Sequence, residues 1–200
     1  MSLLVETIKV RDGEVINIDY HSNRFNMTRK ELFNTGPAVD LFTKIIIPEY
    51  ARKGVFKCRI EYNDQIRKID FIPYEIKRVR TLKLVEADGL DYNYKYINRS
   101  GIEELMGKNN GCDDILMVKE GLITDTSYAN IIVRGNDRIW YTPSSYLLRG
   151  TKREYLLNHG LVREKIITPA SLKKFRELRL INSMLDIDDT ESIPVRTICF

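Results

Sequence analysis

Cysteine and histidine are scarce in this chain of 200 residues, which holds three cysteines and two histidines. Cys58, Cys112 and Cys199 are odd in number and widely scattered, so they do not predict a disulfide framework. Adding His21 and His159 still gives no Cys/His spacing suited to zinc. The scarcity excludes a disulfide scaffold and a zinc module.

Long apolar runs are also missing from the sequence. The best is Ile45-Ile46-Ile47, closed at once by Pro48, whereas a spanning helix needs roughly 20 apolar residues. The beginning of the chain, MSLLVETIKVRDG, goes directly into alternating sequence and lacks the basic start, apolar block and cleavage site of a signal peptide. These absences predict a protein that is not exported, has no membrane partner and lies in the reducing cytoplasm.

The charge is close to balanced, with 32 basic and 28 acidic residues, which predicts a mixed surface. One stretch, from Lys77 to Lys83, is more basic and alternates as a strand would. A solvated edge strand kept soluble by its charges is the favoured interpretation, and nucleic-acid binding is the rival one.

The hydrophobic pattern predicts helices and strands mixed along the whole chain, hence an α/β (α+β) fold in two lobes. In the first lobe, strands are expected near residues 3–10, 14–18, 55–62, 66–73 and 76–86, and helices over 21–34 and 39–51. Asp12-Gly13 is a strong hairpin signal between the first two strands. Periodicity is lost over residues 87–93, so we expect a smaller lobe over residues 1–88 and a larger one over residues 89–200.

The second lobe is expected to hold several short elements. Helices are predicted over about 98–109, 151–159 and 169–175, with strands near 113–119, 122–124, 129–134, 138–142, 162–167, 177–183 and 193–198. Gly160 is placed as the residue that ends the second of these helices.

The common catalytic motifs are absent. The sequence has no Walker loop, no G-x-G-x-x-G, no G-x-S-x-G and no H-E-x-x-H. A catalytic histidine pair would have to be built on His21 or His159, and His159 fits better as a cation at a helix end. If the chain is an enzyme, its chemistry therefore belongs to an organic cofactor.

Four features fit a cofactor that carries an aldehyde, a ring nitrogen and a phosphate. Lys95 lies among tyrosines, which would lower its pKa and suit Schiff-base formation, although most lysines are solvated. Asp125 ends a strand, where an ordinary turn aspartate is the alternative. Gly150-Thr151 opens a helix and would bind an anion or simply cap that helix. Arg24, near the start of the first helix, would bind a phosphate or form a surface ion pair.

Several longer segments carry a resemblance. YKYINRSGIEEL, DDILMVKEGLITDTSYANIIV and IWYTPSSYLLRGTKREYLL, together with VETIKVRDG, HSNR, LINSMLDI and IPV, cover nearly the whole chain in one order. They resemble the class IV (fold type IV) pyridoxal-phosphate (PLP) enzymes, which include branched-chain and D-amino-acid aminotransferases and aminodeoxychorismate lyase. The resemblance implies a D-amino-acid aminotransferase-like fold, shortened at its N-terminus, and a homodimer.

The resemblance also implies a role for each matching residue. Lys95 would form the Schiff base with PLP and shuttle the substrate proton, and Asp125 would hold the pyridine nitrogen protonated. Arg24 would bind the phosphate. Further phosphate contacts would come from the helix start and from a small hydroxyl residue, namely Gly150, Thr151, Lys152 and Ser183. Two positions depart from the family pattern: Asp125 stands where glutamate is usual, and Lys152 stands where a hydroxyl residue is expected.

The resemblance leaves two reaction types open, that of a lyase and that of an aminotransferase. The spacing Lys95-x-x-Asn98-Arg99 is that of the lyases, and Thr7 matches a threonine that lyases hold near the cofactor. We therefore expect a 4-amino-4-deoxychorismate lyase-like enzyme that eliminates pyruvate in folate biosynthesis. A class IV aminotransferase is the alternative, a degenerate relative without catalysis is a third reading, and a nucleic-acid module explains neither Lys95 nor Asp125.

Overall fold

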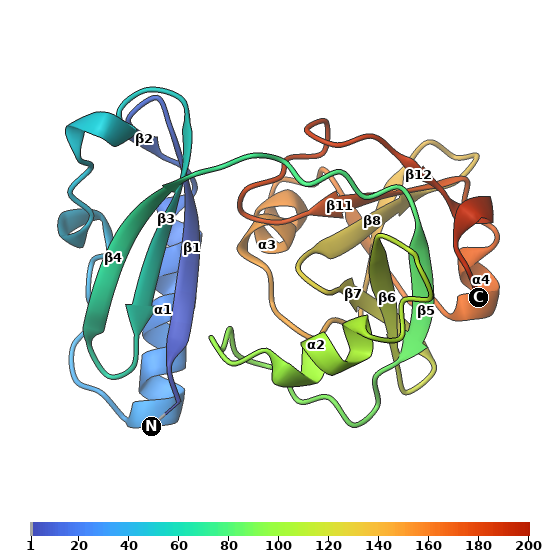
Figure 1. Cartoon of the computed structure of the whole chain (residues 1–200), viewed down its shortest axis with the longest axis horizontal. Coiled ribbons are helices and arrows are strands. Elements are labelled where there is room, and N and C mark those ends of the chain that lie inside the picture. The colour runs from blue at the N-terminus through green and yellow to red at the C-terminus, as the bar shows by residue number, and fades with distance from the viewer. Residues whose placement is uncertain (1) are drawn as a thin grey trace. The chain divides into compact units, whose positions relative to one another are not determined.

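The computed structural model describes residues 2–200, which divide into two compact units (Figure 1). Unit 1 holds the residues up to Glu75 together with Tyr94–Asn98, and unit 2 holds Ile76–Asn93 and Arg99–Phe200. This division differs from the one expected at residue 88. The chain enters unit 2 earlier, and one short segment returns to unit 1 and brings Lys95 with it.

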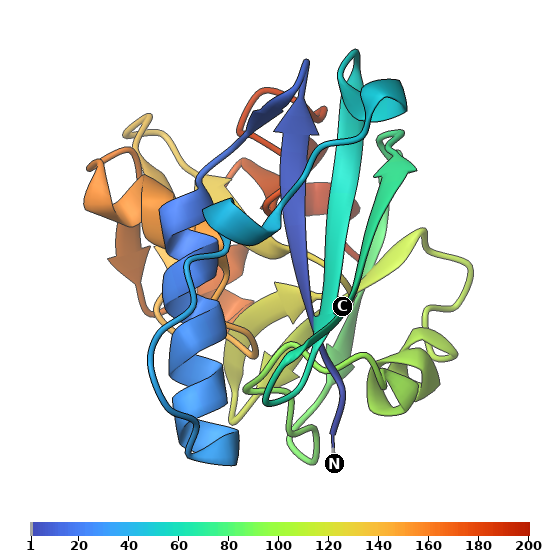
Figure 2. The ribbon, with the colours of Figure 1, turned by 90° about the vertical axis from the view of Figure 1, so that its left-hand side faces the viewer.

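Unit 1 is an antiparallel sheet covered on one face by a long helix, as Figure 2 shows. Its strands run in the order β2-β1-β3-β4, and their bounds are β1 Leu4–Arg11, β2 Glu14–Val15, β3 Val55–Tyr62 and β4 Ile66–Pro73. Asp12 and Gly13 both have positive φ, 50° and 84°, as a tight hairpin turn requires. The helix α1 spans Ile18–Phe33 and ends at Asn34, which takes the left-handed conformation.

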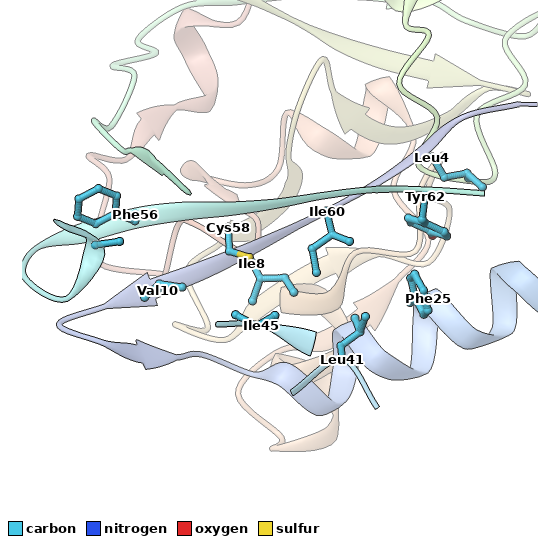
Figure 3. Packing of buried hydrophobic residues seen from close by; sticks show 11 residues of the cluster. Leu4, Ile8, Val10, Phe25, Leu41, Ile45, Phe56, Cys58, Ile60 and Tyr62 are labelled. Atoms are coloured by element: carbon cyan, nitrogen blue, oxygen red, sulfur yellow. The ribbon is translucent and has the colours of Figure 1, made fainter. Parts of the chain in front are cut away.

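The core of unit 1 lies between the sheet and α1 (Figure 3). Alternate residues of β1 and β3 point into it because side chains alternate along a strand. Its fully buried members include Leu4, Ile8, Val10, Phe25, Cys58, Ile60 and Tyr62. The face of β1 that carries this core is also the face that carries Glu6.

The helix expected over residues 39–51 is wrong. Two short 3-10 turns, Phe42–Lys44 and Glu49–Ala51, replace it. Pro48 has no N–H to donate and crowds the preceding turn, and the three successive isoleucines before it are stiff at χ1. Only part of the expected apolar face is therefore buried, and Ile46 remains 84% exposed.

Unit 2 contains two sheets and three α-helices among its described residues. One sheet has the order β5-β6-β7, with β5 and β6 parallel, and the other has the order β10-β9-β8-β11-β12, with β9 and β10 parallel. The strands are β5 Leu82–Glu86, β6 Asp114–Lys119, β7 Leu122–Thr126, β8 Asn130–Arg134, β9 Trp140–Pro143, β10 Arg163–Lys165, β11 Glu177–Ile181 and β12 Ile193–Pro194. The helices are α2 Ser100–Met106, α3 Thr151–Asn158 and α4 Pro169–Leu172, and a 3-10 turn follows at Val195–Thr197. The mixture confirms the expected α/β class.

The strand expected over residues 76–86 forms only from Leu82 onward. Upstream of it, the Asp113 carboxylate accepts the backbone N–H groups of Arg80 (2.8 Å) and Thr81 (3.0 Å). Because a side chain satisfies these donors, no partner strand is needed there. The basic stretch therefore does not present two alternating strand faces.

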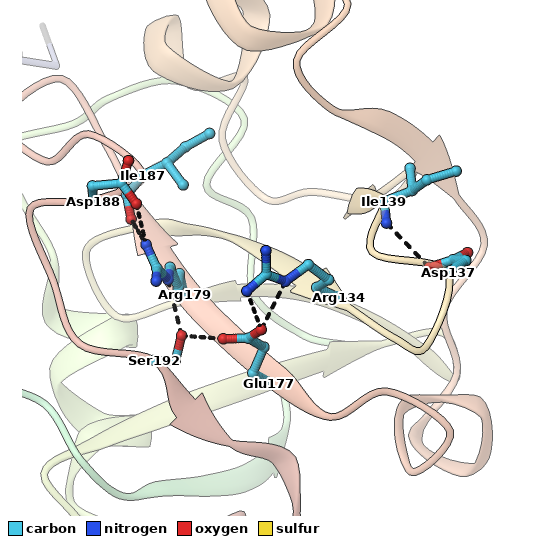
Figure 4. A network of polar contacts seen from close by, with 8 residues as sticks. All are labelled: Arg134, Asp137, Ile139, Glu177, Arg179, Ile187, Asp188 and Ser192. Atoms are coloured by element: carbon cyan, nitrogen blue, oxygen red, sulfur yellow. Dashed lines mark hydrogen bonds and ion pairs between the residues drawn. The ribbon is translucent and has the colours of Figure 1, made fainter.

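A polar network ties β8 to β11 on one side of the larger sheet (Figure 4). Arg134 pairs with Glu177, and Ser192 donates to the same carboxylate. Arg179 donates to Ser192 (2.9 Å) and pairs with Asp188. The network fixes the segment before β12 against β11. None of the helices within residues 2–200 is long and apolar enough to cross a membrane.

Candidate active site

A buried ionic cluster joins β1 to α1 in unit 1. Glu6 is fully buried, and its Oε1 and Oε2 accept Nε–H (2.8 Å) and Nη2–H (2.6 Å) of Arg24. Oε2 also lies 2.7 Å from Nδ1 of His21. His21 and Arg24 meet the same carboxylate because residues three apart lie on one face of a helix. The Arg24 guanidinium donates through Nε and Nη2 in these bonds, and its planar, permanently charged fork is also of the kind that binds phosphates.

Burial and the neighbouring charged groups together set the ionisation of this cluster. Burial alone would raise the pKa of Glu6, but the Arg24 charge and the hydrogen bonds from His21 and Arg24 outweigh it and hold that pKa at about 2. Burial lowers the pKa of His21, and the positive charges of Arg24 and Lys95 lower it further against the pull of Glu6. At neutral pH, Glu6 is therefore ionised and a neutral His21 donates its Nδ1–H to it.

Lys95 lies on the short segment that returns to unit 1. Its carbonyl accepts the N–H of Val5 (2.9 Å), and Tyr96 forms an antiparallel bridge with Leu4. The side chain of Lys95 is half-buried, and its charge acts on His21. The structure thus brings Lys95 and Arg24 into one neighbourhood.

Thr7 lies elsewhere in the same strand. It is next to Glu6 on β1, and adjacent strand residues point to opposite faces of a sheet. Thr7 is therefore on the face away from Arg24 and α1. The structure does not bring its side chain to the Glu6 cluster.

Asp125 is buried near the end of β7 in unit 2 and is held by three N–H donors. Its Oδ1 accepts Nδ2–H of Asn130 (2.8 Å), and its Oδ2 accepts the backbone N–H groups of Leu147 (3.1 Å) and Leu148 (3.0 Å). Burial raises the pKa of Asp125 to about 6, and these hydrogen bonds counter only part of the rise. A carboxylate accepts about four hydrogen bonds, so one further N–H donor fits here.

Gly150 is packed against the same group of residues at the start of α3. A Cβ on Gly150 would lie 1.8 Å from Oδ1 of Asn130, so any larger residue would displace the amide that holds Asp125. Asn130 Nδ2 also donates to the carbonyl of Leu148 (3.1 Å), which closes the loop before α3 onto β8. The absence of a side chain at residue 150 is a built feature of this site.

The first turn of α3 is buried and carries two cations. Thr151, Lys152 and Arg153 are each at most 5% exposed. Lys152 pairs with Asp186, and Arg153 donates to the carbonyl of Pro143 (2.8 Å) and to Glu164. The backbone N–H groups of a first helical turn have no acceptor within the helix, so this end of α3 favours an anion.

Ser183 lies in the turn that follows β11. Asn182 Oδ1 accepts the N–H groups of Met184 (2.8 Å) and Leu185 (3.1 Å) and holds this turn. Asp186, three residues after Ser183, is the partner of Lys152. The turn with Ser183 and the start of α3 are therefore tied together, while the Lys152 ammonium is directed to a carboxylate.

Three positions in these clusters were not predicted from sequence. Glu6 gave a signal, since an acid interrupts an otherwise apolar strand face, and His21 gave one through its three-residue spacing from Arg24. Asn130 gave none, because its role depends on the loop that carries Gly150.

A cavity of about 350 Å³ lies in unit 2, and part of the basic stretch lines it. Residues 76–80, Leu180 and residues 189–191 line it. Its walls combine Lys77, Arg78 and Arg80 with the acids of residues 189–191, so the surroundings mix both signs of charge. This is a hollow of small-molecule size.

The sequence of this chain matches a known protein family over nearly its whole length. Residues 3–196 match the family described as amino-transferase class IV. The chain belongs to the class IV aminotransferases. The expectation of a PLP-dependent enzyme of this family is thereby confirmed.

Individual relatives agree with this assignment. An uncharacterised protein of Haemophilus influenzae is 34% identical over 183 residues, which cover 90% of this chain and 97% of that protein. A candidate 4-amino-4-deoxychorismate lyase from Haemophilus somnus 129pt is 33% identical with a TM-score of 0.84, and the match covers 92% of this chain and 97% of that one.

A more distant structure shares the fold alone. A hypothetical aminotransferase from Mycobacterium tuberculosis in its PLP-bound form is 18% identical with a TM-score of 0.75, and the match covers 98% of this chain and 81% of that one. The match leaves about a fifth of that chain uncovered, whereas both Haemophilus relatives are matched almost in full.

The residues of this chain fit the cofactor of the family. The buried Asp125 carboxylate accepts three hydrogen bonds and has the capacity to accept one more, such as that of a protonated pyridine nitrogen. The glycine at residue 150 leaves space for the Asn130 amide that holds Asp125, and the backbone N–H groups of the helix start beside it suit a phosphate. Lys95 offers a half-buried primary amine, the group that a Schiff base with the cofactor needs.

Proposed function

We propose that this chain is a PLP-dependent lyase that eliminates pyruvate from a 4-amino-4-deoxychorismate-like substrate and so serves folate biosynthesis. The relative from Haemophilus somnus, a candidate 4-amino-4-deoxychorismate lyase, supports the reaction type. The lyase-type spacing Lys95-x-x-Asn98-Arg99 supports it as well. The observation that carries the cofactor-dependent part is the buried Asp125 carboxylate, fixed by three N–H donors with capacity for one more.

Bound PLP supplies an electron sink for the negative charge that develops on the substrate. The Asp125 carboxylate would accept a hydrogen bond from the N–H of the pyridine ring and so keep that ring nitrogen protonated. By the family pattern, Arg24 and the start of α3 would each contribute to phosphate binding, and Lys95 would hold the cofactor and move a proton at the substrate carbon. Asn130 keeps Asp125 in place.

Arg99 supports the geometry through a backbone contact. Its Nη2–H donates to the carbonyl of Ser127, two residues after Asp125. Arg99 also precedes α2, so this bond joins the start of α2 to the loop that follows β7. We assign Arg99 a positioning role in the lyase.

The proposal includes a homodimer in the cytoplasm. Phe42 and Ile46, 62% and 84% exposed, give unit 1 apolar surface of the kind that subunit contacts cover. The odd number and wide scatter of the three cysteines are typical of a protein of a reducing compartment. Light scattering coupled to size exclusion tests the dimer, and a monomeric mass at micromolar concentration would contradict it.

The reaction type is tested with PLP-loaded protein and 4-amino-4-deoxychorismate, without any amino acceptor. The proposal predicts pyruvate and an aromatic amine in equal amounts. Turnover that requires an added 2-oxo acid would instead identify an aminotransferase. Cofactor uptake without turnover of either kind would identify a degenerate relative.

A further inference from the structure

Two of the three cysteines lie side by side in unit 2. The Sγ atoms of Cys112 and Cys199 are 3.6 Å apart although the two residues are separated by 87 positions in the sequence. Cys199 is exposed and Cys112 is half-buried. Small molecules in solution therefore reach this pair of thiols.

Cys199 is held along one edge of β5. Its N–H donates to the carbonyl of Leu82 (2.9 Å), and its carbonyl accepts the N–H of Leu84 (2.8 Å). This is a parallel bridge opposite Lys83. The Lys83 ammonium also donates to the carbonyl of Phe200 (2.9 Å). The backbone of Cys199 is therefore placed as a short added strand.

Cys112 is held at the other side of β5, in the turn before β6. Its N–H donates to the carbonyl of Asn109 (3.0 Å), and Nδ2–H of Asn109 donates to the carbonyl of Cys112 (2.8 Å). The next residue, Asp113, is anchored to the N–H groups of Arg80 and Thr81. Both cysteines thus meet at the start of β5 because backbone hydrogen bonds hold each of them there.

We propose that Cys112 and Cys199 are a modification site. A low-molecular-weight disulfide, such as oxidised glutathione, oxidises the two thiols, and an intramolecular disulfide forms between Cys112 and Cys199. One protein thiolate attacks a glutathione sulfur, the glutathione S–S bond breaks, and one glutathione thiolate leaves. The second protein thiolate then attacks the mixed disulfide and releases the other glutathione. Two protein thiols are oxidised, one glutathione disulfide is reduced to two thiols, and the two protons pass to the leaving thiolates.

The surroundings of the pair suit stepwise reaction. Burial raises the pKa of Cys112, and the hydrogen bond and charge of Cys199 raise it further, while Thr81 and Lys83 act in the opposite direction. Simultaneous ionisation of the two neighbouring thiols is thus disfavoured. One of them therefore reacts first, while the other stays protonated until the second step. The sulfurs must approach to about 2.05 Å, which requires a small shift of the short strand that holds Cys199.

Cys58 provides an internal reference. It is fully buried in the core of unit 1, and burial raises its pKa to about 12. Its thiol is therefore protonated and inaccessible in the folded protein. Reaction of the folded chain should leave it unmodified.

The disulfide would close a long loop. It would join the strand added beside β5 to the turn before β6, and cross-links between distant residues restrict the unfolded chain most. We expect it to raise the Tm of the full chain by roughly 5 °C or more. Reduction should reverse the change.

The experiment uses the full-length protein, reduced and then freed of reductant, with oxidised glutathione at mildly alkaline pH. We expect intact-mass spectrometry to show loss of two hydrogens and no retained glutathione, and peptide mapping to join the peptides of Cys112 and Cys199. Cys112→Ser and Cys199→Ser should each retain one glutathione and show no rise in Tm.

Three results would overturn the assignment. These are wild-type protein that retains two glutathiones, a cross-link that includes Cys58, and a chain that stays fully reduced while the single-serine variants react. Because each is read from mass and not from activity, the outcome does not depend on the proposed reaction.

Discussion

At the scale of single residues, buried charge decides how the candidate site works. Glu6 is a fully buried anion that exists only because Arg24 and His21 surround it, and Asp125 is a buried carboxylate whose donors counter only part of its desolvation. Removing one partner of a buried ion pair usually costs more than the pair itself contributes. The shifted pKa of each acid therefore predicts how stability or cofactor binding changes with pH.

Glu6→Gln should lower the free energy of unfolding by roughly 3 kcal/mol at neutral pH, because it leaves the Arg24 cation without its partner. Denaturant unfolding measures this value. Glu49→Gln is the matched control, since Glu49 forms an exposed pair with Arg52 and should change stability by less than roughly 0.5 kcal/mol. Equal effects of the two substitutions would contradict the account.

The buried Glu6 ion pair should also make the stability of the protein depend on pH. The folded pKa of Glu6 is about 2, below its usual 4.5, so its stabilising contribution is complete above pH 4.5 and is lost as the pH falls toward 2. Glu6→Gln should therefore lose less stability than the wild type across this range. Acid titrations monitored by circular dichroism compare the two proteins, and parallel curves would count against a buried ionised Glu6.

Asp125 should control cofactor affinity as a function of pH. Its pKa is about 6, so its carboxylate is available above that pH and disappears below it. Pyridoxamine phosphate, which forms no Schiff base, is the probe, and calorimetry gives its Kd. Asp125→Asn should weaken binding by roughly tenfold at pH 8 and should flatten the part of the pH dependence that lies near pH 6.

The matched control for this experiment is Asp113→Asn. Asp113 also accepts two backbone N–H groups, but it does so at the start of β5 and outside the Asp125 cluster. Its substitution should leave the Kd unchanged. A Kd that responds equally to both substitutions would remove Asp125 from the proposed site.

At the scale of elements, the parts that sequence predicted well are those governed by local rules. The hairpin at Asp12-Gly13 and the end of α3 at Gly160 follow from backbone conformations that these residue types favour. The helix over residues 39–51 failed because an apolar spacing was given more weight than Pro48. The predicted strand does not form immediately before Leu82, where Asp113, distant in sequence, accepts the N–H groups of Arg80 and Thr81.

Gly150→Ala should disturb the start of α3. The new Cβ would overlap Oδ1 of Asn130, so the amide must move and its bond to Asp125 must lengthen. We expect a loss of roughly 1–3 kcal/mol in unfolding free energy and weaker binding of pyridoxamine phosphate. Gly36→Ala is the control because no atom lies within 4 Å of its added Cβ. An unchanged Kd in Gly150→Ala would separate this glycine from the cofactor.

At the scale of the whole molecule, the path of the chain determines which unit holds Lys95, the proposed Schiff-base lysine. β2 is only two residues long, so the edge of β1 near Leu4 is left open on that side. Residues 94–98 pair with this edge and place Lys95 in unit 1. Composition and periodicity do not reveal such a return, since it depends on pairing between distant segments. The roles of the candidate residues stay predictions, which rest on the order of the motifs that resemble the family.

The central claim is that Lys95 holds the cofactor, and reduction tests it most directly. The protein is incubated with PLP, reduced with borohydride, digested and mapped by mass spectrometry. The account predicts a phosphopyridoxyl group on Lys95 and its loss in Lys95→Ala, while Lys152→Ala keeps the group on Lys95. A stable modification of a different lysine, or a wild-type protein that takes up no cofactor, would contradict it.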